Sequence, residues 1–174
     1  EAIKNNAILA ITNKKFKNFR NIFSKNPLTQ LNKFSSVYRK SLDSNNIAIT
    51  GSAGKTSVKD LTGFCLNKLD KTYFSKNSFN NKYGVPLSII NSPQSTKFSV
   101  LEVGMDKKRE IDTLTKLIRP NLGLITNISY AHIKNFKNLD EIAKAKGEII
   151  NNIFPSGVMI INKDDKYCNY FISK

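Results

Sequence analysis

The chain has 174 residues, of which 40% are hydrophobic and 24% are charged, a composition typical of a globular domain that excludes wholesale disorder. No apolar run approaches the roughly 20 residues needed to cross a bilayer, and no secretory signal pattern is visible, so we expect no membrane insertion. The formal net charge of +15 favours anionic ligands, but the lysines are spread along the whole chain instead of forming one basic block, so no nucleic-acid partner is expected.

The first 45 residues differ in pattern from the rest of the chain. An apolar cluster over residues 7–11 predicts a short strand. Leu31, Phe34 and Tyr38 follow at helical spacing, and Pro27 is well placed at the start of that helix because proline fits the first helical turn. This segment therefore predicts one strand followed by one helix.

From residue 47 onward, apolar strands alternate with helical patterns. The strands are expected over residues 47–50, 72–74, 98–103, 122–128 and 158–161. The helices are expected over residues 57–69, in a short stretch after Pro86, around 110–118 and over 139–153. This alternation indicates an α/β fold with a mostly parallel, P-loop-type sheet flanked by helices. Ligands of such sheets bind beyond the carboxyl ends of the strands.

The strongest motif lies between the strand at 47–50 and the helix that follows it. It is a phosphate-binding loop made of Gly51, Ser52, Ala53, Gly54, Lys55, Thr56 and Ser57. The two glycines permit backbone angles closed to other residues, so that successive N–H groups point at an anion. Lys55 adds a charge for the β- and γ-phosphates, and the Thr56 hydroxyl can ligate Mg²⁺. The motif predicts a site for a nucleoside triphosphate with Mg²⁺.

Polar side chains also follow other predicted strands at this edge of the sheet. Glu102 is the acidic residue near the end of the strand at 98–103, and Asn127 closes the strand at 122–128. A carboxylate on a buried strand needs a partner or a metal ion, so we favour Mg²⁺ binding for Glu102. Asn127 is placed to contact the nucleotide. On this pattern alone, the interpretation that we favour for His132, the only histidine, is a structural role.

The two cysteines, Cys65 and Cys168, lie far apart in the sequence. Few and widely spaced cysteines are typical of proteins that keep their thiols reduced, which predicts a cytoplasmic location. Cys65 falls within the helical pattern after the phosphate loop, and we expect its thiol to pack in the core.

These motifs together resemble those of the Mur ligases, the ATP-dependent enzymes that extend the peptide of the peptidoglycan precursor. The matching segments are residues 50–59, 79–87, 100–104, 126–128, 131–132, 142–149 and 161–165, in the order and spacing of the family. The phosphate loop alone is widely shared. Asn-Asn-x-x-Gly-Val-Pro at 80–86 together with Ala-Lys-Gly-Glu at 145–148 is specific to one branch, which joins D-alanyl-D-alanine to UDP-MurNAc-tripeptide.

The resemblance implies roles for individual residues. The loop would hold the phosphates of ATP. The implied metal ligands are Thr56, Glu102, His132 and Lys146, and the implied catalytic residues are Lys55, Glu102, His132 and Lys146. Lys146 matches a lysine that several Mur ligases carry as a carbamate, which turns a cation into a metal-binding anion; the alternative is a plain lysine on the helix surface. Asn80 and Asn81 match the loop that approaches the muramoyl substrate.

The implied reaction is amide formation driven by ATP. The terminal carboxylate of UDP-MurNAc-tripeptide attacks the γ-phosphate to give an acyl phosphate, and the amine of D-alanyl-D-alanine then displaces phosphate. The implied partners are ATP and these two substrates. Two alternatives stay open. One is another Mur or folylpolyglutamate-type ligase, against which the segment at 80–86 argues, and the other is a basic P-loop module that binds nucleic acid.

The resemblance also implies a domain organisation. Mur ligases have an N-terminal domain for the UDP-sugar, a central ATPase domain and a C-terminal domain for the incoming amino acid or dipeptide. Residues 1–45 resemble the end of the N-terminal domain, and residues 46–174 resemble the central domain without its last elements. We therefore expect this chain to lack the C-terminal domain that would bind D-alanyl-D-alanine.

Some positions depart from the family's pattern. Asn77 stands where glycine is usual, and Ser78 stands where asparagine is usual. Lys134 replaces a frequent glutamate, and residues 136–138 replace a usual Phe-Gly-Ser. We expect these departures to change the local shape of the loops more than the nucleotide site.

Overall fold

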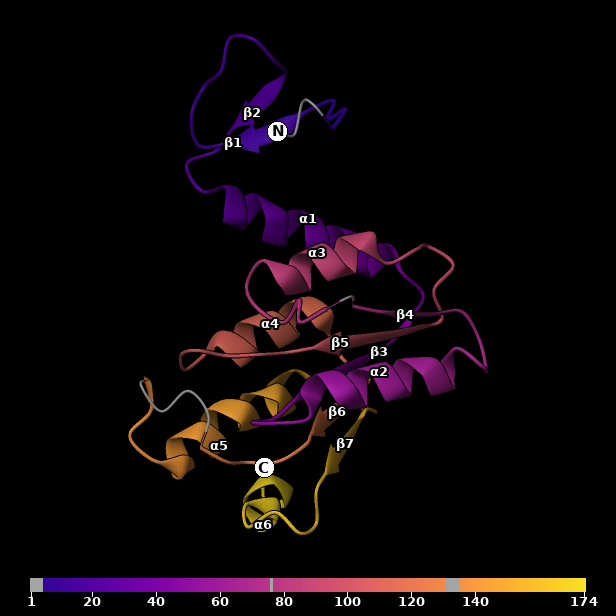
Figure 1. Ribbon diagram of the computed structural model, residues 1–174, viewed down its shortest axis with the longest axis vertical. Coiled ribbons are helices and arrows are strands. Elements are labelled where there is room, and N and C mark those ends of the chain that lie inside the picture. Colours follow the sequence, from indigo (N-terminus) through magenta and orange to yellow (C-terminus); the bar gives the residue numbers. More distant parts are fainter. Residues whose placement is uncertain (1–4, 76, 131–134) are drawn as a thin grey trace.

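The computed structural model describes residues 5–75, 77–130 and 135–174. At its centre is a five-stranded sheet with the order β4-β5-β3-β6-β7, in which all neighbouring strands are parallel (Figure 1). The strands are β3 (Asn45–Thr50), β4 (Thr72–Phe74), β5 (Phe98–Glu102), β6 (Leu122–Ile125) and β7 (Val158–Ile161). The expected α/β fold with a parallel sheet is confirmed.

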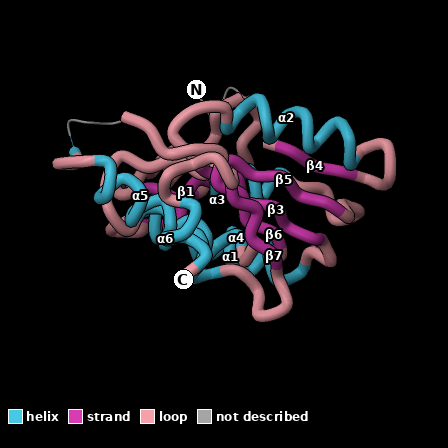
Figure 2. The backbone as a smooth tube through the Cα atoms, turned by 90° about the horizontal axis from the view of Figure 1, so that it is seen from below, coloured by secondary structure: helices cyan, strands magenta, loops and turns pink. Residues whose placement is uncertain are grey.

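Helices cover both faces of the sheet, as the alternating pattern predicts. They are α2 (Lys55–Leu66), α3 (Gly84–Asn91), α4 (Glu110–Ile118) and α5 (Leu139–Gly147), followed by the 3₁₀ helix η2 (Glu148–Asn152) and the short α6 (Cys168–Ile172). α2 lies on the opposite side of the sheet from α4 (Figure 2). Because β3 lies between β5 and β6, the loop that follows β3 is at the middle of the carboxyl edge, where ligands of such sheets bind.

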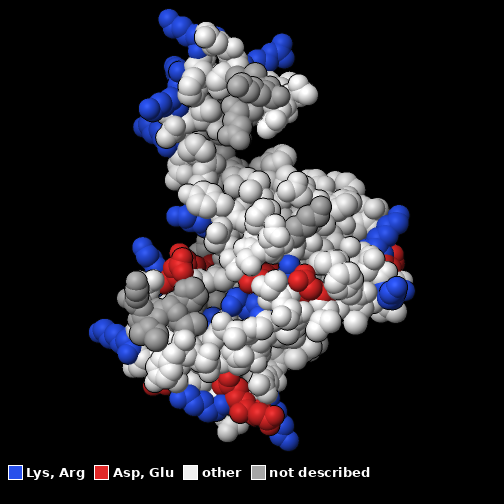
Figure 3. Space-filling view, in the orientation of Figure 1, with Lys and Arg blue, Asp and Glu red and all other residues white. Residues whose placement is uncertain are grey.

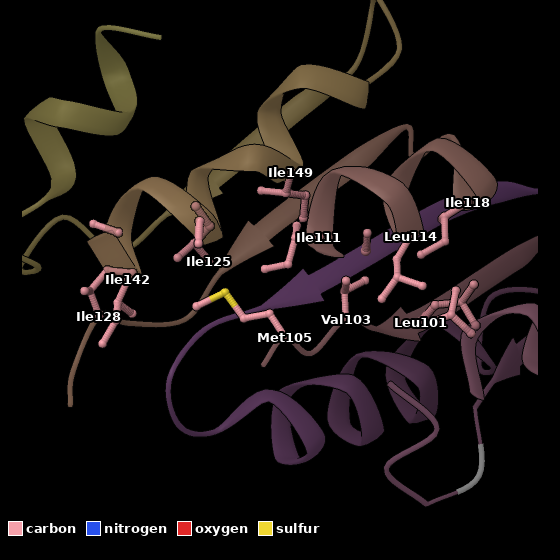
Figure 4. Close-up of a cluster of buried hydrophobic side chains, with 14 of the residues drawn as sticks. Leu101, Val103, Met105, Ile111, Leu114, Ile118, Ile125, Ile128, Ile142 and Ile149 are labelled. Carbon is pink, nitrogen blue, oxygen red and sulfur yellow. The ribbon is translucent and has the colours of Figure 1, made fainter. Parts of the chain in front are cut away.

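The larger part of the hydrophobic core lies on the α4 side of the sheet (Figure 4). Its buried members include Leu101, Val103, Met105, Ile111, Leu114, Ile118, Ile125, Ile142 and Ile149. Ile111, Leu114 and Ile118 recur at helical spacing on one face of α4, which explains why that helix packs against the sheet. A smaller cluster of Ile47, Ile49 and Val100 lies under α2 on the other face.

Most element boundaries follow the prediction, and β4, β7 and α4 match it in full. The strand expected over 122–128 ends at Ile125, because the residues beyond it turn to hold the phosphate loop. The helix expected over 139–153 changes to η2 after Gly147, where the Glu148 carboxylate accepts a hydrogen bond from the Arg109 N–H at 2.8 Å. α6 was not predicted.

The N-terminal segment forms a second, two-stranded sheet away from the main one (Figure 1). β1 (Ala10–Thr12) lies slightly later than the strand expected over 7–11, and β2 (Asn21–Phe23), which pairs with it in parallel, was not predicted. α1 (Pro27–Ser41) starts at the expected proline, and it packs against α3 and α4. In the part of the chain that the structure describes, every helix is too short or too polar to cross a membrane.

The prediction that Cys65 packs in the core is wrong, because its side chain is exposed on α2. The side of α2 that faces the sheet carries Lys59 and Gly63, which are one turn apart. A Cβ at Gly63 would lie 2.5 Å from the Phe74 ring, so the helix can pack this closely only without a side chain there. Position 65 falls on a different side of the helix and faces solvent.

Candidate nucleotide-binding site

The phosphate loop connects β3 to α2 at the middle of the carboxyl edge. Its two glycines have positive φ, +145° at Gly51 and +78° at Gly54, as expected for a loop that turns its N–H groups inward. A Cβ at Gly51 would lie 1.8 Å from the Thr126 hydroxyl oxygen, so no larger residue fits there. α2 begins directly after Gly54, which places the positive end of its dipole at the loop.

The residues that follow β6 hold this loop in place. The backbone carbonyl of Asn127 accepts a hydrogen bond from the Ser52 N–H at 2.9 Å, and its side-chain oxygen accepts one from the Ala53 N–H at 3.1 Å. The Thr126 hydroxyl donates to the Ala53 carbonyl at 2.6 Å, and the Ser52 hydroxyl donates to the Ser129 carbonyl at 2.9 Å. Asn127 therefore acts on the loop, and its contact with a nucleotide stays a prediction.

A buried carboxylate lies beside the loop. Glu102, the last residue of β5, is 1% exposed. One of its oxygens accepts a hydrogen bond from the Thr56 hydroxyl and the other from the Asn80 side-chain amide, both at 2.7 Å. Both partners are neutral, and none of the ion pairs within the described residues involves Glu102. A buried carboxylate without a cation is costly, so this site suits a divalent cation with oxygen ligands such as Mg²⁺.

Beyond Thr56, the structure brings no predicted metal ligand among its described residues into hydrogen-bond or ion-pair contact with Glu102. The described residues contain no group of three or more His, Cys, Asp or Glu side chains that could hold a metal ion. His132 falls in 131–134 and so lies outside the described residues. Among the predicted metal ligands, Thr56 and Glu102 are the pair that the structure brings into contact, and Mg²⁺ usually takes further ligands from phosphates and water.

Two lysines meet at one carbonyl oxygen of the loop. The Nζ atoms of Lys55 and Lys146 lie 2.9 Å and 2.8 Å from the Gly51 oxygen. Lys146, on α5, is 2% exposed, so the alternative of a plain surface lysine is wrong; Lys144, two residues earlier, is the exposed one. Burial, together with the charge of Lys55, lowers the pKa of Lys146 to about 7. Near neutral pH, part of its population is a neutral, nucleophilic amine.

The site opens into a cavity of about 630 Å³. Four of the predicted site residues line it, namely Lys55, Asn80, Asn81 and Lys146. The space-filling view shows basic side chains inside a recess on this face of the molecule, with acidic side chains beside it (Figure 3). The structure thus brings Lys55 and Lys146 to the walls of the same cavity as the predicted substrate residues Asn80 and Asn81.

The two asparagines also have partners within the protein. The Asn81 side-chain oxygen accepts hydrogen bonds from the N–H groups of Tyr83 and Gly84, both at 3.0 Å, and so satisfies two N–H groups at the start of α3. Asn80 donates to Glu102, and its backbone carbonyl accepts a hydrogen bond from the Gly104 N–H at 2.8 Å. Contact of either asparagine with a muramoyl substrate stays a prediction.

Sequence reasoning missed Lys59, which is 1% exposed on the inner face of α2. Its Nζ donates to the backbone carbonyls of Ser75 and Asn77, at 2.5 Å and 3.2 Å. Helical spacing could have indicated its burial, because Lys59 lies one turn after Lys55 and one turn before Gly63 on the side of α2 that packs against the sheet.

A second cavity, of about 410 Å³, lies at the opposite edge of the sheet, beside the starts of β3 and β6. It contains none of the predicted site residues. Arg39 on its wall is 8% exposed, and its guanidinium donates to the carbonyls of Leu42 and Ile118 at 3.2 Å and 2.9 Å. This arginine therefore satisfies the carbonyl end of α4 and has a structural role.

The parallel sheet, the glycine loop and the helix that starts at Lys55 define the class of this chain, a nucleotide-binding α/β domain of the P-loop type. Residues 49–174 match the family model of the Mur ligase middle domain. The chain belongs to the Mur ligase family.

Relatives and solved structures agree with this assignment. The chain is 39% identical over 146 residues to UDP-N-acetylmuramoyl-tripeptide–D-alanyl-D-alanine ligase of Buchnera aphidicola, which covers 84% of this chain and 32% of the relative. It is 38% identical over 138 residues to the Bacillus subtilis ligase of the same name, which covers 79% of this chain and 30% of the relative. The chain thus spans about a third of the length of these relatives.

Among solved structures, a crystal structure of MurF from Acinetobacter baumannii superposes with a TM-score of 0.91 at 28% identity and covers 98% of this chain and 38% of the other. MurF ligase from Thermotoga maritima, solved in complex with ADP, superposes with a TM-score of 0.87 at 25% identity and covers 97% of this chain and 40% of the other.

Proposed function

We propose that this chain is the ATP-binding domain of a ligase that joins D-alanyl-D-alanine to UDP-MurNAc-tripeptide in peptidoglycan precursor synthesis. The observation that carries the proposal is that one cavity is lined by Lys55 and Lys146 together with Asn80 and Asn81. A reaction between a nucleotide phosphate and a second substrate needs such a shared space. The relatives that bear this activity in their names, at 38–39% identity, support the choice of substrates.

In the first step, an oxygen of the terminal carboxylate of UDP-MurNAc-tripeptide attacks the γ-phosphorus of ATP. The bond to the β-γ bridging oxygen breaks, ADP leaves and an acyl phosphate forms. Lys55 and the N–H groups of the loop offset the negative charge on the transferring phosphoryl group. In the second step, the amine of D-alanyl-D-alanine attacks the acyl carbon, phosphate leaves with the electron pair of the broken carbon–oxygen bond, and the nitrogen loses a proton to water to give the amide. Neither step needs a covalent nucleophile from the protein.

Thr56 and Glu102 are the residues that would hold Mg²⁺, and His132 would contribute to a second ion. The ion supplies neutralisation of the phosphate and carboxylate charges. Asn80 keeps one oxygen of Glu102 occupied and so fixes the direction in which the other points. The roles of these residues in the reaction follow from the family resemblance and from the partners described above.

Lys146 is the candidate for a carbamate. Its neutral amine would attack CO₂, a nitrogen–carbon bond would form, and the nitrogen would lose a proton to give a carbamate anion. A buried amine with a pKa of about 7 is suited to this addition, because the neutral form is populated near physiological pH. The product would replace a repulsive pair of cations at Gly51 with an attractive pair of opposite charges.

The domain assignment is part of the proposal. Residues 46–174 would be the central ATP-binding domain, and residues 1–45 would be the last part of the domain that binds the UDP-sugar. The separate two-stranded sheet of β1 and β2 supports a boundary before β3. D-alanyl-D-alanine would be bound by another part of the enzyme. We place the activity in the cytoplasm.

The proposal is tested first on nucleotide binding. The thermal-unfolding midpoint of the chain should rise with Mg²⁺–ATP, since a ligand at about 100 times its dissociation constant adds roughly 2.7 kcal/mol of stability. The rise should be lost in Lys55→Ala. In a full-length ligase that contains this chain, Lys55→Ala should lower turnover with UDP-MurNAc-tripeptide and D-alanyl-D-alanine by about a hundredfold or more. Turnover close to that of the wild type would refute the assignment.

A further inference from the structure

The side chain of Lys59 is almost completely buried, and its ammonium group has three oxygen atoms within hydrogen-bond distance. Nζ donates to the Ser75 carbonyl at 2.5 Å and to the Asn77 carbonyl at 3.2 Å, and it lies 3.0 Å from a carboxylate oxygen of Asp60. An ammonium group has three protons and accepts no hydrogen bonds, so these three oxygens satisfy it. Asp60 itself is partly exposed, with a side chain 42% exposed.

These contacts connect two parts of the site that are distant in the sequence. Lys59 lies one turn after Lys55 on α2, the helix whose first residues belong to the phosphate loop. Its two carbonyl acceptors precede Asn80, which donates to Glu102 at 2.7 Å. Asn77, the second of these acceptors, has a φ of +54°, so the backbone is left-handed at the point where Lys59 holds it.

Burial of a lysine is costly, and an apolar side chain would pack on the inner face of α2 without that cost. A lysine that keeps three oxygen partners there acts as a fixed connection between the helix and the segment it holds. Removing the ammonium would leave the Ser75 and Asn77 carbonyls without this donor. The segment that leads to Asn80 would then be held less firmly relative to Glu102, with the hydrogen bond from the Gly104 N–H to the Asn80 carbonyl still in place.

We propose that Lys59 is a positioning residue that couples the phosphate-loop helix to the substrate side of the cavity. It holds the backbone at Ser75 and Asn77, and through that backbone it keeps Asn80 against Glu102. This inference rests on the proposed function, because it gives Lys59 an effect on the use of the carboxylate substrate and not on the binding of ATP alone.

The test uses Lys59→Met in a full-length ligase that contains this chain. The value of kcat/KM for UDP-MurNAc-tripeptide should fall about 10- to 100-fold, the equivalent of one or two lost hydrogen bonds to a charged group. The dissociation constant for Mg²⁺–ATP should change by less than about threefold, because Lys55 and Thr56 are untouched. Lys68→Met, which removes an exposed lysine just beyond α2, is the matched control and should change neither value.

A coupling measurement separates positioning from a general loss of stability. Asn80→Ala should give the same pattern of kinetic constants with Lys59 intact. If Lys59 acts through Asn80, the double variant should be no worse than the worse single variant. If the two fold-losses in kcat/KM multiply in the double variant, the inference is overturned. Unchanged kinetic constants in Lys59→Met would overturn it as well. If the methionine variant does not fold, Lys59→Gln is measured in its place by the same criteria.

The failure of this inference can be told apart from the failure of the proposed function. A wild-type ligase that does not use UDP-MurNAc-tripeptide refutes the function, whatever the variants do. Hydrogen exchange then still tests the contact itself in the chain: amides of residues 77–83 should exchange faster in Lys59→Met than in the wild type, with α2 unchanged. Equal exchange in the two proteins would show that Lys59 does not hold this segment.

Discussion

Two buried lysines flank the start of α2, and their surroundings differ sharply. Lys59 has three oxygen partners, one of which is the carboxylate of Asp60. Lys146 has the single carbonyl of Gly51, which it shares with Lys55, and no carboxylate pairs with it among the described residues. Both side chains are at most 2% exposed. Equally buried lysines thus have three oxygen partners in one case and one in the other, and burial of Lys146 lowers its pKa to about 7.

This difference in hydrogen-bond partners indicates that Lys59 has a structural role and that Lys146 can react. A saturated, paired ammonium stabilises the backbone that it contacts, and it has no free proton or lone pair with which to react. A lysine with one acceptor and a cation beside it is strained in its charged form, so it gains from losing a proton or from becoming an anion.

The largest expected effect is on turnover. Lys146→Ala in a full-length ligase should lower kcat by about a hundredfold or more, because the variant loses a charged group beside the phosphate loop. If Lys146 acts as a carbamate, formate or acetate should restore part of the activity by placing a carboxylate in the vacated space. Turnover is measured with and without these anions.

Lys59→Met is the control for this rescue. Its loss is that of a hydrogen-bond donor to two carbonyls, which a small carboxylate cannot supply. Absence of rescue in Lys146→Ala would leave Lys146 as an ordinary buried amine, and rescue of both variants would remove the distinction between the two lysines.

A smaller effect is expected on the pH dependence of stability. In the unfolded chain Lys146 has its ordinary pKa of 10.5, and in the folded chain the value is about 7. Between these values the unfolded chain binds more protons, so the free energy of unfolding should rise with pH by at most about 1.4 kcal/mol per unit. The contribution of Lys146 to the free energy of unfolding is complete above its pKa of 10.5 in the unfolded chain. It is lost as the pH falls through its pKa of about 7 in the folded chain.

Lys146→Met should remove this slope and should stabilise the folded chain near pH 7, where the wild type carries a poorly solvated charge. Urea unfolding between about pH 7 and about pH 10, inside the window between the folded and unfolded pKa values of Lys146, gives the slope. The buffers are free of CO₂, since a carbamate would change the titrating group. Lys144→Met, on the exposed side of α5, reports the effect of simply removing a positive charge. Parallel curves for wild type and Lys146→Met would contradict the expected titration.

The fold and half of the site follow from local patterns in the sequence. The apolar strands predict the parallel sheet, and parallel strands bring Glu102 to the loop that carries Thr56, which the structure confirms with a distance of 2.7 Å. The roles that depend on packing were not predictable in this way. Lysine is usually exposed, so the burial of Lys59 depends on carbonyls that lie 16 and 18 positions away.

Two other cases show the same limit. The exposure of Cys65 depends on which side of α2 faces the sheet. A short helical pattern does not fix the rotation of the helix about its axis closely enough to decide this. The position of Asn127 after a strand predicts contact with the nucleotide, which stays a prediction, and it does not reveal that the oxygens of this residue accept hydrogen bonds from the loop. In each case a residue's neighbours in space, which the sequence pattern does not specify, decide its role.

The smallest expected effect is at Asn77, whose carbonyl is one of the acceptors of Lys59. Its φ of +54° explains how asparagine can stand where the family tends to have glycine, because asparagine tolerates the left-handed region better than other residues with a Cβ. Asn77→Gly should therefore change the free energy of unfolding by less than about 0.5 kcal/mol, since relief of backbone strain is offset by the greater freedom of glycine in the unfolded chain. Asn77→Val should cost about 1–2 kcal/mol, because a β-branched residue is poorly tolerated at this φ. Denaturant unfolding of the two variants measures both values, and an equal cost for glycine and valine would mean that the asparagine side chain, and not the turn, holds the acceptor of Lys59 in place.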